Sequence, residues 1–369
     1  MKIRSSLVAT LGIAICVPLP CLATTYSITD LGTLPGNSAS TGFGVNASGQ
    51  VVGVAAAAGN SVQHAFLYTG GVMQDLGTLP ANNFSQAWAI NDSGQVVGQS
   101  TNFDTFEGAD THAFLYSSGT MQDLGTLGGA LSVARGINAS GQVVGISSLA
   151  DSAEGDVNAN AFVYSEGVMH DLGPGAAFGI NDSGQIVGSS QGHAFRYSDG
   201  VMQDLGTLPG GTGSDGHAIN AGGQVVGVSA TLGDSAQHAF LYSGTLMHDL
   251  GTLPGDSFSE AWAINNSGQV VGESDSHAFL YRDGVMYDLN ALINPSSGWE
   301  IQRAFGINDR GQITGLGTFF GQQDAFLLTP VPEPSSLVLA AVGFAGLAAS
   351  RWRKLRPKRE RLHGHGFSC

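Results

Sequence analysis

The sequence predicts an all-β protein, a seven-bladed β-propeller of four-stranded antiparallel blades that its N-terminal strand closes. Two observations predict this fold class. A unit of four short apolar segments recurs seven times, with Gly, Asn, Asp and Ser between the segments. The repeat region also begins with a lone fourth segment and ends with a third segment, so that its two ends complete one unit. Four strands cannot cover both faces of their own sheet, whereas seven sheets packed around an axis can.

The first and second segments are expected to form a tight hairpin. The first ends in "IN" or "VN", and the second begins with "GQVVG" or a close variant. The intervening "NDSG" and "NASG" tolerate turn and left-handed conformations, and segments of four to six residues are too short for helices. The asparagines that end the first segments are Asn46, Asn91, Asn138, Asn181, Asn220, Asn265 and Asn308.

The third segment is "HAFLY" or a relative, and the fourth resembles "GVMQDLG". Five units carry a histidine at the head of the third segment, and Asn160 and Asp324 replace it in the other two. Zinc needs ligands about 2 Å away, but equivalent residues on neighbouring sheets stand roughly 10 Å apart. We therefore expect hydrogen bonding at a strand end, with repeated aspartates such as Asp75 and Asp204 capping turns. The histidines are His64, His112, His193, His238 and His277.

Both tight turns of each unit fall on one face, because successive strands alternate in direction. The longer, variable connections share the opposite face, where we expect any binding site. Intervals between successive fourth-segment aspartates are 45, 48, 48, 33, 45 and 39 residues, which loops outside a ring accommodate. A linear β-solenoid is the alternative, but it tolerates such variation poorly and needs no complementary end strand.

Over residues 24–330, the recurrence of "HAFLY" with "INDSGQVVG" and "DLGTLPG" resembles the HAF-repeat family of exported bacterial proteins. The resemblance covers nearly the whole region between the terminal segments. It implies an extracellular setting but no particular activity.

Residues 1–23 have a basic start, an apolar stretch and the small Ala23 at their end, which predicts a secretory signal peptide cleaved after Ala23. A buried N-terminal helix is the alternative. Cys16 and Cys21 lie in this segment and Cys369 is the last residue, so a processed protein would contain no cysteine and no disulfide.

Residues 331–359 contain Pro332, Glu333 and Pro334, then an apolar stretch at 337–350 predicted to be a short transmembrane helix, then arginines; a tail follows at 360–369. This pattern resembles the PEP-CTERM sorting signal of Gram-negative bacteria. The resemblance implies recognition by an exosortase and removal of the tail. An inner-membrane-anchored precursor would then be delivered to the cell surface or the exopolysaccharide matrix.

Composition limits the partners of the body of the chain. The protein has 369 residues, with 55 glycines, 42% hydrophobic residues and 12% charged residues, which favours a packed core with many turns. Between Thr24 and Glu333 lie 28 of the 29 acidic residues, five arginines and no lysine, a formal charge of −23. Such a body is expected to repel nucleic acid and anionic lipid, and to attract divalent cations or basic partners.

Two connections between second and third segments are acidic and belong to adjacent units. Carboxylate oxygens suit Ca²⁺, although neither connection has the alternating D-x-D-x-D-G ligand spacing. A solvated acidic loop is the simpler interpretation, and calcium is the only cofactor that the sequence suggests. The candidate ligands are Asp104, Glu107, Asp110, Asp151, Glu154 and Asp156.

Three tryptophans of the repeat region differ in their expected roles. Trp299 lies in the longest fourth-to-first connection, where an exposed indole could stack on a sugar ring, although packing is favoured. Trp88 and Trp262 fall inside first segments and are expected in the core.

These patterns favour an exported, non-enzymatic binding or structural module at the cell surface or in the exopolysaccharide matrix. The partners expected are the secretion machinery and an exosortase during export, then an extracellular polysaccharide or a surface protein. The membrane is contacted only through the C-terminal helix before processing. The alternatives are a Ca²⁺-dependent adhesion module, or a secreted glycosidase or lyase with two carboxylates roughly 5–10 Å apart. No catalytic residue can be separated from the copies that the repeat encodes.

Overall fold

The computed structural model describes residues 25–56, 63–103, 111–150 and 159–331, and within these ranges the protein is all-β. Strands β1–β28 account for nearly all regular structure there, beside the short 3₁₀ helices Leu232–Asp234 and Leu289–Leu292. In that part of the chain, no helix has the length and apolar character needed to cross a membrane. The predicted signal peptide and the predicted C-terminal helix lie outside the described residues.

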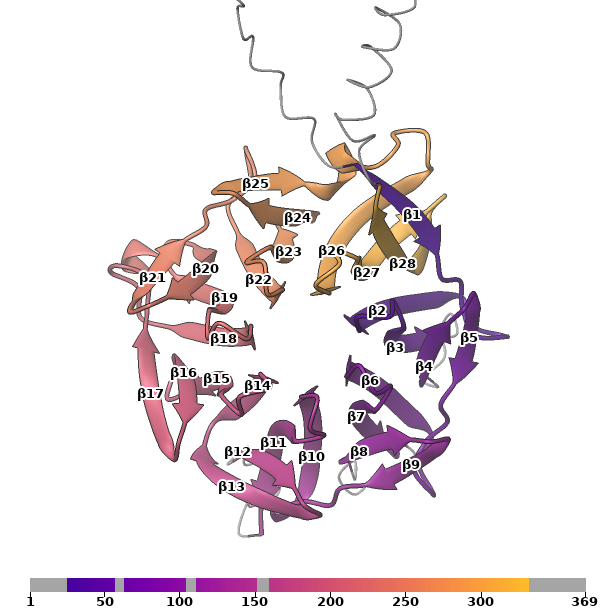
Figure 1. Cartoon of the computed structure of the whole chain (residues 1–369), viewed down its shortest axis with the longest axis vertical. Helices are drawn as coiled ribbons and strands as arrows, with labels where there is room; N and C mark the ends of the chain where they lie inside the picture. The colour runs from indigo at the N-terminus through magenta and orange to yellow at the C-terminus, as the bar shows by residue number, and fades with distance from the viewer. Residues whose placement is uncertain (1–24, 57–62, 104–110, 151–158, 332–369) are drawn as a thin grey trace, which may run out of the picture.

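The described strands form seven four-stranded antiparallel units, and a parallel bridge between Thr111 of β8 and Leu131 of β10 joins the second and third units into one eight-stranded sheet. Figure 1 shows the units around a common centre. The first three units are β2 (Ala39–Val45), β3 (Val51–Ala56), β4 (Gln63–Thr69) and β5 (Val72–Asp75); β6 (Phe84–Ile90), β7 (Val96–Thr101), β8 (Thr111–Ser117) and β9 (Thr120–Asp123); and β10 (Gly128–Ile137), β11 (Val143–Leu149), β12 (Ala159–Ser165) and β13 (Val168–Pro174).

The next three units are β14 (Ala176–Ile180), β15 (Ile186–Ser190), β16 (His193–Ser198) and β17 (Val201–Gly206); β18 (Ser214–Ile219), β19 (Val225–Ala230), β20 (Gln237–Ser243) and β21 (Leu246–Asp249); and β22 (Ser259–Ile264), β23 (Val270–Ser274), β24 (His277–Arg282) and β25 (Val285–Asp288). The last comprises β26 (Trp299–Ile307), β27 (Ile313–Phe319), β28 (Gln322–Pro330) and β1 (Tyr26–Asp30).

The N-terminal strand completes the last unit, as the sequence predicted. Strand β1 pairs antiparallel with β28, in a register that runs from Tyr26 opposite Pro330 to Asp30 opposite Phe326. The backbone N–H of Leu31 extends this pairing by donating to the Ala325 carbonyl oxygen at 3.0 Å. The two ends of the repeat region are therefore held together by one antiparallel ladder (Figure 1).

The seven asparagines at the ends of the innermost strands, here called the asparagine layer, join these units into a closed cycle. Each side-chain Nδ2 donates to the backbone oxygen of the next asparagine, for example Asn46 to Asn91 at 3.2 Å. Asn308 donates back to Asn46 O at 2.8 Å, and this bond closes the cycle. All seven asparagines are buried, so each bond is shielded from water.

Each of these asparagines also holds its own hairpin. The Oδ1 atom of Asn46 accepts from the backbone N–H groups of Ser48 and Gln50, and Gly49 adopts a left-handed φ of 82°. The predicted turn chemistry is thus present, and it explains why Gly follows Asn at a fixed spacing.

The core lies within and between adjacent units. The phenylalanine of each third strand is 0–2% exposed and packs over a glycine of the second strand. A Cβ at Gly53 would collide with the Thr41 carbonyl oxygen and the Phe66 ring. Glycine is therefore required in "GQVVG" because the neighbouring strand and ring approach its backbone closely.

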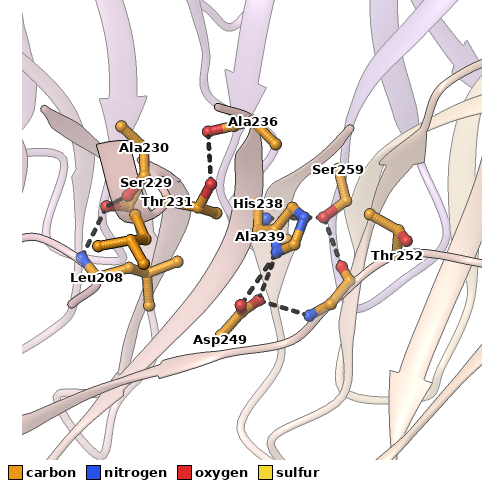
Figure 2. Close-up of polar contacts among 12 residues, drawn as sticks. Leu208, Ser229, Ala230, Thr231, Ala236, His238, Ala239, Asp249, Thr252 and Ser259 are labelled. Carbon is orange, nitrogen blue, oxygen red and sulfur yellow. Dashed lines mark hydrogen bonds and ion pairs between the residues drawn. The ribbon is translucent and has the colours of Figure 1, made fainter. Parts of the chain in front are cut away.

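A serine of the innermost strand links five of the unit junctions. Figure 2 shows one example: Ser259 Oγ accepts from the Ala239 N–H at 2.8 Å and donates to the Gly251 oxygen at 2.6 Å. The same contacts are made by Ser40, Ser85, Ser132 and Ser214. Polar groups that neighbouring strands leave unpaired at the junction are satisfied in this way.

Candidate functional site

A cavity of about 480 Å³ lies among the innermost strands, and we call it the axial cavity. Seven of its lining residues stand three positions before the asparagine of their strand, one from each unit. We call them the bulge layer: Phe43, Trp88, Arg135, Phe178, His217, Trp262 and Phe305. Because each inner strand runs toward its asparagine, the cavity lies on the variable-connection side of the asparagine layer.

A β-bulge presents each of these side chains to the axis. The ladder between first and second strands skips one residue in every unit, for instance between Ala87 and Ala89, and the skipped residue belongs to the bulge layer. A bulge leaves one residue unpaired and re-aims its side chain. The glycine opposite, such as Gly98, provides the space that the distorted strand needs.

The bulge-layer side chains contact their neighbours around most of the ring. Phe43 lies 4.5 Å from Trp88 and 5.1 Å from Phe305 between ring centroids. Trp262 lies 5.6 Å from Phe305 and stacks on His217 at 4.5 Å with an interplanar angle of 8°. Such spacings are those of favourable aromatic pairs.

The series of contacts ends at Phe178 on one side and at Arg135 on the other. Phe178 meets only the edge of the His217 ring, at 5.8 Å and 83°. The Arg135 guanidinium carbon lies 4.0 Å from the centroid of the Trp88 ring, a cation–π geometry. Among the described residues, no ring contact links Phe178 to Arg135, although their strands are adjacent. The ring of side chains is therefore open at this junction.

Arg135 is a cation without a carboxylate partner in the described part of the chain. No aspartate or glutamate oxygen described there lies within 4.0 Å of its guanidinium. Its Nε and the Trp88 Nε1 are buried and have no hydrogen-bond partner among the described groups. Burial lowers the pKa of Arg135 to about 10, so the guanidinium stays protonated at neutral pH.

A group of charged residues lies on the opposite sector of the axis; we call His217, Glu260, Glu273 and Arg303 the charged sector. Glu260 on β22 and Glu273 on β23 face each other across the ladder. The Arg303 Nε lies 2.6 Å from Glu273 Oε2, and His217 Nε2 lies 3.5 Å from Glu260 Oε1. The Glu273 side chain is only 6% exposed, against 51% for Arg303.

Burial dominates the titration of this sector. It raises the pKa of Glu260 to about 7, and the nearby carboxylates of Glu273 and Asp215 add to the rise while Arg303 opposes it. Burial also raises the pKa of Glu273, which Arg303 again opposes, and lowers the pKa of His217. Near neutral pH the sector thus holds one partly protonated carboxyl, one ion pair and an uncharged imidazole.

Two tryptophans were assigned wrongly by the sequence pattern. Trp88 and Trp262 were expected in the core, but both line the axial cavity. Alternation along a regular strand places a residue on one face of its sheet, and the bulge removes this residue from the alternation. A usable signal was present, since the position three before each asparagine reads F, W, R, F, H, W and F between two positions that hold only Gly or Ala.

Trp299 stacks on Phe319, with ring centroids 5.2 Å apart and an interplanar angle of 22°, and packs against the core of the last unit. Its role in sugar contact stays a prediction. The six candidate calcium ligands, Ala23 and the Pro332–Pro334 triplet lie outside the described residues. Within those residues, no group of three or more His, Cys, Asp or Glu side chains is arranged to hold a metal ion.

Four of the five repeated histidines make the strand-end hydrogen bonds that were expected, whereas His277 Nδ1 lies 3.5 Å from Asp256 Oδ2. His64 Nδ1 lies 2.8 Å from Asp75 Oδ2 in the same unit, and Figure 2 shows the equivalent His238–Asp249 pair at 3.0 Å. Asn160 reaches Asp171 at 2.8 Å in one of the two units without a histidine. The aspartates also cap turns, as Asp75 does by accepting from the Gly77 N–H at 2.7 Å. These pairs therefore stabilise the third and fourth strands of their own unit.

Comparison with known proteins identifies a sorting motif and a similar fold. Residues 330–354 match the PEP-CTERM protein-sorting motif, which indicates an exported protein made as a membrane-anchored precursor. No curated protein matches the chain.

Among solved structures, the chain is similar to the extracellular domain of a hybrid two-component system from B. thetaiotaomicron. The TM-score is 0.52 and the identity 12%, over 84% of this chain and 40% of the other. A Pyrococcus horikoshii acylaminoacyl peptidase gives 0.46 at 12% identity, over 82% and 54%. A Trypanosoma rangeli sialidase gives 0.39 at 9%, over 89% and 61%. The chain thus spans less than two thirds of each of these proteins, and the likeness concerns the fold alone.

Proposed function

We propose that this chain is an exported seven-bladed β-propeller of the HAF-repeat type that acts at the cell surface or in the exopolysaccharide matrix as a non-enzymatic binding module. The axial cavity is its ligand site. An exosortase is the partner expected for the C-terminal segment.

The propeller assignment is supported by the closed cycle of asparagines and by the pairing of β1 with β28. Both features bring the first and last units of the repeat region together, as a closed propeller requires. A linear solenoid would leave its first and last units apart, and Asn308 would have no reason to meet Asn46.

The binding role rests on one observation: the bulge layer is where the repeated units differ in chemistry although they share one geometry. Three phenylalanines, two tryptophans, an arginine and a histidine face a cavity whose volume lies in the range of small-molecule sites. Aromatic faces with a few polar groups are what a sugar-binding surface requires.

A glycan-array screen of the protein purified after export tests this role. We expect a set of glycans to bind the wild type and to lose at least about tenfold in affinity in Trp88→Ala, because this change removes an aromatic wall of the cavity. Trp299→Ala is the matched comparison, since its indole does not line the cavity and is the other sugar contact that the sequence suggested. Equal losses in the two variants, or no glycan bound by the wild type, would reject the axial cavity as the site.

The charged sector favours a second candidate, acid–base hydrolysis of glycosidic bonds. Glu260 has the raised pKa of a general acid, and Glu273 faces it across the ladder. This activity ranks lower because the Glu273 carboxylate is 6% exposed and occupied by Arg303, which leaves a substrate little access. Hydrolysis of any glycan bound on the array, abolished by Glu260→Gln, would reverse the ranking.

A further inference from the structure

The cations of the body are concentrated at the axial cavity. Five arginines and no lysine lie between Thr24 and Glu333, against 28 acidic residues. Two of the five, Arg135 and Arg303, line the cavity. Arg303 is neutralised by Glu273 at 2.6 Å, whereas no described carboxylate pairs with Arg135. A protein with so negative a body thus places one uncompensated positive charge beside its axial cavity.

Keeping Arg135 in this place has an energetic cost. The partly buried Arg135 guanidinium loses hydration, and the Trp88 ring at 4.0 Å recovers part of this loss. The Nε atom nevertheless lacks a hydrogen-bond partner among the described residues. Unsatisfied buried donors are rare in native proteins, and such a donor is usually satisfied by a water, an ion or a ligand. Guanidinium groups bind carboxylates in a planar, bidentate geometry, so the missing group is expected to be a carboxylate.

The open junction between Arg135 and Phe178 gives the ligand a second contact. The nearest described ring neighbour of Phe178 is His217, which it meets edge-on at 5.8 Å. In the sector across the axis, Glu273 is paired with Arg303, so Arg135 is the one positive charge at the cavity without a described carboxylate partner. A single positive charge matches one negative charge better than a multiply charged anion such as a phosphate. A singly charged sugar with an apolar ring face suits both contacts.

We propose that the axial cavity binds a sugar ring that carries a carboxylate, a uronic acid, with the carboxylate paired to Arg135 and the ring against Phe178. This inference rests on the proposed binding role and specifies its ligand class. The ligand is either the end of an acidic polysaccharide or a free acidic sugar, which share this chemistry.

Calorimetric titration of the full-length protein with methyl β-glucuronide and methyl β-glucoside tests the inference, because these probes differ in the carboxylate. We expect the glucuronide to bind the wild type at least about tenfold more tightly. Arg135→Gln removes this preference, Arg135→Lys keeps part of it, and Phe178→Ala weakens both probes. Arg310→Gln removes an exposed arginine at a hairpin turn, and this control leaves both affinities unchanged. A melting curve for each variant verifies folding.

Equal affinity for the two probes, or an unchanged preference in Arg135→Gln, overturns the uronic acid assignment. Absence of glucuronide binding at 10 mM overturns it as well. If glycans on the array still bind in a Trp88-dependent manner, the binding role survives either result. Where the glucuronide binds, tighter binding of a trisaccharide that ends in glucuronate identifies a polysaccharide end as the source. Equal binding of the two identifies the free sugar.

Discussion

The asparagine layer and the bulge layer lie three residues apart in every inner strand, yet they differ in chemistry. Asparagine stands at the first position in all seven units, whereas the second holds four residue types. Asn181 forms hydrogen bonds within its own hairpin and to the next unit. Phe178 contributes its side chain to a shared cavity. Identical residues at one position of a repeat therefore indicate hydrogen bonds that every unit needs. Divergent residues at one geometric position are what the proposed ligand site is inferred from.

This difference predicts that substitutions at the two positions of one strand change the free energy of unfolding by very different amounts. Asn181→Ala removes the two bonds donated by Nδ2, at 2.9 and 3.0 Å, and leaves the Asn220 carbonyl oxygen without its side-chain donor. We expect a loss of roughly 3–5 kcal/mol in the free energy of unfolding, measured by urea denaturation. Phe178→Ala is the matched comparison and should cost about 1 kcal/mol, since its ring is half-buried. Similar losses at the two positions would remove the distinction between the layers.

The charged sector extends the comparison of the two layers to stability. Residues kept for function rather than for folding are expected to lower the free energy of unfolding. Burial and the carboxylates of Glu273 and Asp215 raise the pKa of Glu260 to about 7, above its ordinary value of 4.5. Between these two pH values the folded state holds a proton that the unfolded state has released. Stability therefore falls as pH rises from about 4.5 to about 7, and the full penalty persists above that range.

Glu260→Gln removes this penalty while it keeps the shape of the side chain. At pH 8 we expect the variant to be more stable than the wild type by up to about 3 kcal/mol, and at pH 4.5 by almost nothing. Urea denaturation at a series of pH values measures both differences. A constant difference across this range would show that Glu260 does not titrate as its burial requires.

Much of the fold could be predicted, because the same turn-forming and core residues recur in every unit. The "NDSG" and "NASG" hairpins, the pairing of β1 with β28 and the turn caps made by aspartates such as Asp75 followed from residue types and spacing. Each of these features depends on local sequence or on matching chain ends, which a single sequence reveals. Hydrogen bonding by the histidines was expected, but Asp75 was not foreseen as the partner of His64.

The axial cavity could not be predicted, because it depends on a bulge whose effect is to break the alternation that strand prediction uses. Trp88 and Trp262 were placed in the core for this reason, and Arg135 was not considered as a site residue at all. Comparison of the units at equivalent positions finds the bulge layer, since it varies where its neighbours do not. The pairing of Glu260 with Glu273 needs the register of one particular unit and is absent from the repeat pattern.

The smallest expected effect comes from the residue adjacent to Glu260 in β22. Ser259 belongs to the repeated set that joins neighbouring units (Figure 2), so its loss should destabilise the protein, with the opposite sign to Glu260→Gln. Ser259→Ala leaves the Ala239 N–H without its acceptor, and we expect a loss of about 1–2 kcal/mol in urea denaturation at pH 8. Ser235→Ala, which removes a hydroxyl from an exposed connection, should change stability by less than about 0.5 kcal/mol. Two of the seven junctions lack this serine, among them the one before β14, where Gly175 takes its place, so the ring tolerates its absence at these junctions. If Ser259→Ala proves neutral or stabilising, the serine is dispensable at the junctions. The repetition of a residue in successive units would then no longer indicate that the fold needs it.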